Sequence, residues 1–325
     1  MYYRCNNLLF LPILFFVIIL TAISCNNTRN IVPNDADSED ISQPLQPNEE
    51  EIPGKLTFGE DSVPGFSLQI EMLTDSAEVY VNVSRFTDID TDTKITVNIL
   101  DFIVNQLESS GFITENKFKV SEIFPKMLDS EGSTEAAVEC FFKTIEYDFE
   151  QQLPEIYSYK VPYNITFDIF PVYIDRNYIT FFQSAYCYTG GAHGNTVMKL
   201  ITYYLNDGTE LTFDDIFLPS SISQIREEVA AHMAYSYPLY ENITTVDQYI
   251  DSLNLWLGNE PEEAGEVSSP KITLANFPLP QAALNSSGVV FVYPMYELTP
   301  GSEGCPVVIL PYHDVKDFLK INIGK

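Results

Sequence analysis

Residues 161–169 read VPYNITFDI, and this stretch decides the fold class. Every second residue is apolar and the residues between are mostly polar, which is the period of a β-strand with one buried face. Two further strand-like stretches follow at 178–188 and 197–205, and residues 206–208, NDG, end the second one with turn chemistry. Aromatic strands of this kind indicate a sheet with helices on one face and a partly solvated opposite face.

Helical patterns lie on both sides of these strands. Apolar residues recur at helical spacing in segments 92–109, 134–153 and 221–235. A further helix is expected from Thr245, whose spacing to Gln248 is that of a capping box. The other expected elements are strands at 67–71, 77–83, 288–293 and 306–310 and a short helix at 314–320. Helices and strands occur in separate runs, and the strands look hairpin-linked. We therefore expect an α+β fold with antiparallel sheets, helices packed on one face, and two closely associated domains.

The first 24 residues have the features of a targeting segment. An apolar run at residues 8–20 is shorter than a membrane span, and residues 22–25 then read AISC, which resembles a bacterial lipobox. We therefore expect Cys25 to carry lipid, palmitate included, and to anchor the protein in the outer membrane or cell envelope, facing the periplasm. An ordinary secretory signal followed by an unrelated cysteine is the alternative.

The remaining sequence divides into a tether and two folded regions. Residues 25–61 are rich in Pro and acidic residues and nearly lack aromatic residues, so we expect a disordered, extended tether. A globular pattern then covers residues 62–195 and 196–325, which are expected to be two α+β domains.

Composition and charge exclude several classes of partner. The 325 residues include 46 Asp and Glu against 17 Lys and Arg, which gives a formal net charge of −29 at pH 7. Binding to nucleic acid or docking on anionic lipid requires basic residues, so neither interaction is expected. A basic protein, in contrast, would be attracted to a surface this acidic.

No complete catalytic or metal-binding set is present, so the sequence favours a non-enzymatic protein without cofactor or metal. There is no G-x-S-x-G elbow, and the His and Cys residues lack zinc-ligand spacing. Asp214, Asp215 and His193 motivate the alternative, which is an envelope glycan hydrolase or deacetylase with an unrecognised site. The cysteines of the folded part, which could form one disulfide or stay as thiols, are Cys140, Cys187 and Cys305.

Three spaced motifs are distinctive: residues 186–194 read YCYTGGAHG, residues 206–217 read NDGTELTFDDIF, and residues 288–298 read GVVFVYPMYEL. They resemble an RsiV-like extracytoplasmic bacterial family, which includes the ectodomain of the anti-sigma factor RsiV and the amino-terminal accessory region of the peptidoglycan deacetylase PdaC. The resemblance covers roughly residues 65–320 and implies two fused domains of unknown function. It also implies a binding module for a lysozyme-like basic protein or a peptidoglycan fragment. An anti-sigma role is not implied, because the sequence shows no sigma-binding segment and no transmembrane helix.

Two of these motifs supply the candidate binding residues. The glycine-rich loop offers backbone amides to a ligand, although a tight connection between two strands is the structural alternative. The tyrosines of the third motif could line a groove, although half-buried sheet residues of this type are common. The candidates are Gly190, Gly191, His193, Tyr293, Tyr296 and Glu297.

Overall fold

The computed structural model describes residues 66–74, 77–86, 93–152, 163–240, 243–258 and 270–323. All of them fall within one compact unit, residues 52–325. Cys25 and the expected tether lie outside the described residues.

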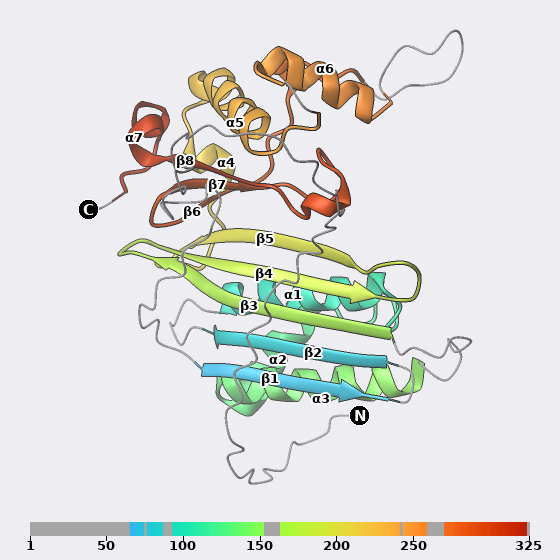
Figure 1. Ribbon diagram of the computed structural model, residues 1–325. Coiled ribbons are helices and arrows are strands. Elements are labelled where there is room, and N and C mark those ends of the chain that lie inside the picture. The colour runs from blue at the N-terminus through green and yellow to red at the C-terminus, as the bar shows by residue number, and fades with distance from the viewer. Residues whose placement is uncertain are drawn as a thin grey trace, which may run out of the picture. The chain divides into compact units, whose positions relative to one another are not determined.

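A five-stranded sheet contains its strands in sequence order, β1-β2-β3-β4-β5 (Figure 1). The strands are β1 (Phe66–Leu73), β2 (Ala77–Phe86), β3 (Tyr163–Ile174), β4 (Tyr178–Tyr188) and β5 (Asn195–Tyr204). Three neighbouring pairs are antiparallel, but β2 and β3 are parallel. The expectation of hairpin-linked antiparallel strands throughout is therefore wrong at this pair. Parallel strands need a crossover connection, and the helices between β2 and β3 supply it.

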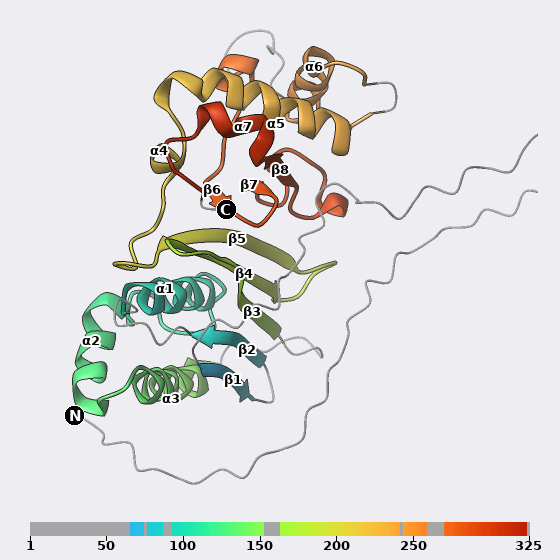
Figure 2. The same ribbon diagram turned by 90° about the vertical axis from the view of Figure 1, so that its left-hand side faces the viewer.

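The crossover consists of α1 (Thr93–Ser109), α2 (Val120–Glu131) and α3 (Thr134–Gln152). Figure 2 shows all three helices on the same side of the sheet. The periodicity predicts α1 and α3 with bounds close to those observed, whereas α2 is not expected because Pro125 lies inside it. The apolar stripes of α1 and α3 pack against β1–β5 in one hydrophobic core. Its largest fully buried side chains include Phe112, Phe124, Phe141, Phe149, Phe167 and Phe181.

The second half of the chain forms a three-stranded antiparallel sheet, β6 (Ala282–Leu284), β7 (Gly288–Val292) and β8 (Val307–Pro311). Its helices are α4 (Phe213–Ile216), α5 (Ile222–Ser236), α6 (Val246–Trp256) and α7 (Tyr312–Val315). Short 3-10 turns occur at Pro219–Ser221, Leu274–Asn276, Gly301–Glu303 and Lys316–Phe318. These elements share a second core, which includes Phe217, Tyr249, Phe277 and Tyr293.

The two sheets meet at β5. The Thr202 hydroxyl accepts a 2.9 Å hydrogen bond from the Leu284 amide of β6, and a small apolar cluster that includes Leu200 and Val290 lies beside this bond. The protein is thus an α+β fold with two sheets that each have a core, as expected from the sequence. None of the helices in the described part of the chain is both long and apolar enough to cross a bilayer.

Candidate functional site

The loop between β4 and β5 contains the predicted glycines, and both have positive φ. Gly190 has φ 94° and Gly191 has φ 104°, a region that only glycine adopts at low cost. The Tyr188 hydroxyl donates a 3.0 Å hydrogen bond to the Gly191 carbonyl, and His193 Nδ1 lies 3.0 Å from the Gly194 carbonyl. The loop is therefore internally braced, and His193 is held at its surface.

Two exposed tyrosines lie directly against glycines. A Cβ at Gly194 would lie 2.5 Å from Tyr186 Cζ, and a Cβ at Gly301 would lie 2.2 Å from Tyr296 Cζ. Side chains larger than hydrogen are excluded at both positions unless the rings move. Tyr186 is 44% exposed and Tyr296 is 47% exposed, so both side chains remain accessible to solvent.

Tyr296 joins the carboxy-terminal motif to the glycine-rich loop. Its hydroxyl lies 3.3 Å from His193 Nε2, and the two ring centroids are 6.3 Å apart. Tyr296 also has φ 67°, a conformation that is uncommon for a bulky residue. Strained residues of this kind concentrate at functional sites. We call Tyr186, His193 and Tyr296 the tyrosine–histidine cluster.

The other two candidates of the third motif lie elsewhere. Tyr293 is fully buried, and its hydroxyl donates a 2.9 Å hydrogen bond to the Pro278 carbonyl. Burial raises the pKa of Tyr293 far above its usual value. Glu297 is half-buried and lines a pocket, and burial raises the pKa of its carboxyl as well. The structure therefore brings His193 and Tyr296 together, places Tyr293 in the core, and directs Glu297 into a neighbouring cavity.

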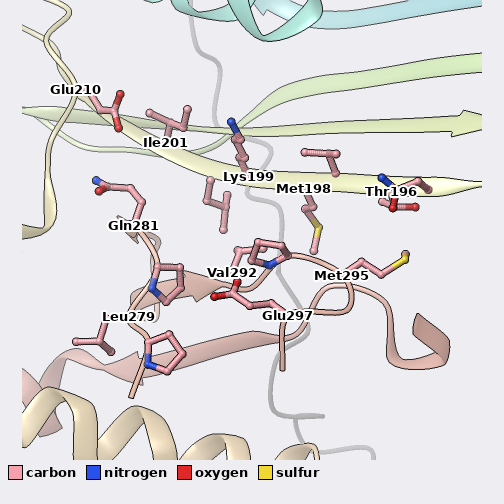
Figure 3. A pocket seen from close by; sticks show the side chains of 16 residues that line it. Thr196, Met198, Lys199, Ile201, Glu210, Leu279, Gln281, Val292, Met295 and Glu297 are labelled. Carbon is pink, nitrogen blue, oxygen red and sulfur yellow. The ribbon is translucent and has the colours of Figure 1, made fainter. Parts of the chain in front are cut away.

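This cavity of about 580 Å³ lies along β5 (Figure 3). One wall is the strand segment 195–201, and the other consists of residues 278–281 together with Pro294, Met295 and Glu297. Its volume is within the usual range for ligand sites. Sequence reasoning missed the cavity because its walls come from segments about eighty residues apart with no shared motif. The position of β5 at the end of the strand order, with only its carboxy-terminal end paired to residues 209–211, leaves room for the cavity.

Charged groups sit at two places in the cavity. Burial raises the pKa of Glu210, and the nearby Lys199 ammonium acts in the opposite direction. Lys199 Nζ also lies 5.6 Å from the Phe102 ring centroid, a cation–π distance. Glu297, on the opposite wall, takes part in no ion pair found among the described residues. The Glu210 charge is thus partly balanced and the Glu297 charge is not.

Two cysteines near the site carry free thiols. The Cys305 thiol lies 3.8 Å from the Thr196 carbonyl of β5, and the Cys187 thiol lies 3.2 Å from the Ser110 hydroxyl. Burial raises the pKa of both thiols, although backbone hydrogen bonds from Met295 and Met198 oppose this at Cys305. Both thiols are therefore protonated at neutral pH.

Asp214 and Asp215 are not part of this site. The Asp215 carboxylate accepts hydrogen bonds from the Thr212 amide and hydroxyl, at 2.9 and 2.6 Å, and so forms the capping box of α4. It acts electrostatically on Tyr204 at the end of β5, whereas His193 precedes the start of this strand. Ten extended residues span roughly 30 Å, so the aspartates and the histidine do not converge. Within the described ranges, no group of three His, Cys, Asp or Glu residues is placed to hold a metal ion.

Comparison with known proteins places one family model on this chain. Residues 214–313 match the model described as "Protein of unknown function (DUF3298)". A search of curated proteins found no match. Among solved structures, the chain is similar to a DUF3298 family member from Bacteroides fragilis, with 18% identity, 84% of this chain and 96% of that chain covered, and a TM-score of 0.47. It is also similar to a DUF3298 family protein from Pseudomonas aeruginosa, with 16% identity, coverage of 80% and 96%, and a TM-score of 0.43.

Proposed function

We propose that this protein is an envelope-anchored lipoprotein of the RsiV-like type whose folded part binds a basic, lysozyme-like protein without catalysing a reaction. The observation that carries the proposal is the contact between Tyr296 and His193. It places an exposed tyrosine ring beside an exposed imidazole, and Tyr296 has a strained backbone conformation at this contact. Aromatic residues held rigidly at a surface are the groups that dominate the energy of protein interfaces.

The overall charge supports the same partner class. A formal net charge of −29 attracts a basic protein at long range and increases its association rate. Charge alone gives weak binding that fades with salt, since exposed charges are screened over about 10 Å at 0.1 M ionic strength. The tyrosine–histidine cluster would supply the specific contact that persists at physiological salt.

Titration with lysozyme at low and at physiological salt tests the proposal. We expect Tyr296→Ala and His193→Ala to lower the affinity at physiological salt by about tenfold or more, because each removes a central contact. Tyr235→Ala is the matched control, since Tyr235 is 81% exposed on α5 and lies outside the cluster. Binding that is salt-labile and unchanged by both cluster variants would show the proposal to be wrong. Binding of soluble peptidoglycan fragments in place of lysozyme would assign the surface to a glycan.

A further inference from the structure

The outward backbone groups at the edge of β5 have hydrogen-bond partners at both ends of the strand and none among the described residues in the middle. Met198, which is half-buried, and Leu200, which is buried, lie in this middle part and both line the cavity. In an antiparallel strand, alternate residues direct both backbone groups away from the partner strand. At the carboxy-terminal end, Thr202 and Tyr204 use their outward groups, because the Leu211 amide donates to Thr202 and the Tyr204 amide donates to Thr209. The same alternation makes the backbone groups of Thr196, Met198 and Leu200 point outward as well.

Cys305 blocks the other end of this edge. Its thiol lies 3.8 Å from the Thr196 carbonyl, and the Met198 amide is near enough to the same sulfur to lower the pKa of the thiol. Three outward groups remain, namely the Met198 carbonyl and the amide and carbonyl of Leu200. In the part of the chain that the structure describes, no residue forms a hydrogen bond with them. The strand therefore directs two hydrogen-bond acceptors, the Met198 and Leu200 carbonyls, and one donor, the Leu200 amide, toward the cavity.

Among the described residues, the opposite wall of the cavity forms no backbone hydrogen bond with this edge. Three of its residues, Pro278, Pro280 and Pro294, have no backbone amide hydrogen to donate. The Pro278 carbonyl already accepts from the Tyr293 hydroxyl, and the Pro294 carbonyl accepts from the Glu297 amide. The cavity thus stays open beside an unpaired strand edge.

We propose that this edge binds a short extended segment of a protein partner, which adds as a strand beside Met198 and Leu200 and places a Lys or Arg side chain against Glu297. The inference rests on the proposed protein-binding function and names how part of the partner is held. Leu200 offers an amide and a carbonyl on one side, which is the arrangement that a peptide residue complements with its own two groups.

The cavity side chains suit a peptide of variable sequence with one basic residue. Glu297 is half-buried and has no ion-pair partner among the described residues, so a cation from the partner would satisfy it. Met198 and Met295, whose side chains Figure 3 shows on opposite walls, are unbranched and adapt their shape to different apolar neighbours.

A synthetic peptide probe tests strand addition directly. The probe is an acetylated and amidated heptapeptide in which valine and lysine alternate, titrated against the full chain by calorimetry. Two further peptides are N-methylated on alternate backbone amides: one peptide on its lysine amides, the other on its valine amides. In an added strand, only the lysine amides or only the valine amides face β5, so only one of the two methylated peptides loses its hydrogen bonds to the protein. We expect one methylated peptide to lose affinity by about tenfold or more, which corresponds to about 1.4 kcal/mol, and the other to bind like the parent. Equal binding of both, or no binding of the parent, would overturn the inference.

A protein variant tests the role of Glu297. Glu297→Gln should lower the affinity for the lysine-containing probe by about tenfold, because a charge-assisted contact is lost. Glu303→Gln is the matched control, since Glu303 is exposed, nearby in sequence and outside the cavity. An unchanged affinity in Glu297→Gln would contradict the assignment.

Lysozyme titration separates the two proposals. If lysozyme binding depends on Tyr296 but the two methylated peptides bind equally, the proposed function stands and strand addition is wrong.

Discussion

Glycine is required in the candidate site for two different physical reasons. Gly190 and Gly191 have positive φ, and Gly191 has no atom within 4 Å of where a Cβ would lie. Only the backbone conformation requires glycine at residue 191. Gly194 and Gly301 have ordinary φ, but a Cβ at either position would overlap a tyrosine ring. The first pair shapes the loop, and the second pair leaves room for tyrosine rings close to the backbone.

Gly191→Val should lower the free energy of unfolding by more than about 1 kcal/mol, because a β-branched residue is strained at φ 104°. For a folded unit of this size, the melting temperature should fall by about 2–4 °C per kcal/mol. Calorimetry or chemical denaturation measures the change. Gly190→Val should behave in the same way. Unchanged melting temperatures for both variants would mean that the loop adopts another conformation.

Residue types alone indicate the loop but not the site that it forms. The glycine-rich motif predicts positive φ, which the structure confirms. The contact between His193 and Tyr296 joins residues that are 103 positions apart, and no local pattern predicts a contact at that separation. Tyr293 and Tyr296 look equivalent in the sequence, yet one is buried and the other is 47% exposed. The difference arises because the chain leaves β7 at Val292 and turns, with Tyr296 at positive φ.

At the scale of elements, helices with a clear apolar stripe are predictable and the connection between strands is not. The sequence predicts α1, α3, α5 and α6 because their periodicity is local. Thr245 caps α6 by accepting from the Gln248 amide, as expected, but the Gln248 side chain accepts from Thr244 instead of returning to Thr245. The parallel pairing of β2 and β3 depends on three helices docking on one face, which is a tertiary property.

A buried carboxylate fixes the segment after α1 onto α3. Asp148 of α3 accepts hydrogen bonds from the Thr114 amide and hydroxyl, at 2.8 and 3.2 Å, and pairs with Lys117. Burial by itself would raise the pKa of Asp148, but the hydrogen bonds from Lys117 and Thr114 and the Lys117 charge outweigh burial and hold the pKa below its usual value. The carboxylate therefore stabilises the folded state when it is ionised.

Asp148→Asn should lower the free energy of unfolding at neutral pH by about 1.5–3 kcal/mol, the usual range for hydrogen bonds to a charged group. Because the folded-state pKa is lowered, this stabilisation is present above the unfolded pKa of about 3.9 and is lost as the pH falls through the folded pKa. The difference between the two proteins should therefore shrink in acid. Glu146→Gln, an exposed change on the same helix, should show no such convergence. Parallel stability curves for Asp148→Asn and the original protein would disprove the role of this carboxylate.

At the scale of the whole molecule, charge and site have separate roles in the proposed binding. The net charge of −29 is spread over the chain, so it attracts basic partners without selecting among them. Selection of one partner requires a specific local arrangement of side chains or backbone groups. The described residues offer two such arrangements close together in the sequence, the tyrosine–histidine cluster and the unpaired edge of β5. Asn195, which lines the cavity, follows His193 by two residues, so one partner could occupy both surfaces.

The proposed lipid anchor at Cys25 gives a test that does not depend on the folded part. Cys25 follows the sequence AIS and precedes an acidic stretch, and it lies outside the described residues. If Cys25 carries lipid, Cys25→Ala should move the protein from the membrane fraction to the soluble fraction, because several acyl chains are needed for stable anchoring. Cys305→Ala is the matched control, since the Cys305 thiol is half-buried beside β5 and should not affect partition. Metabolic labelling with a palmitate analogue should label the original protein and Cys305→Ala but not Cys25→Ala. A Cys25→Ala variant that remains in the membrane fraction would show that the protein is held there by another means.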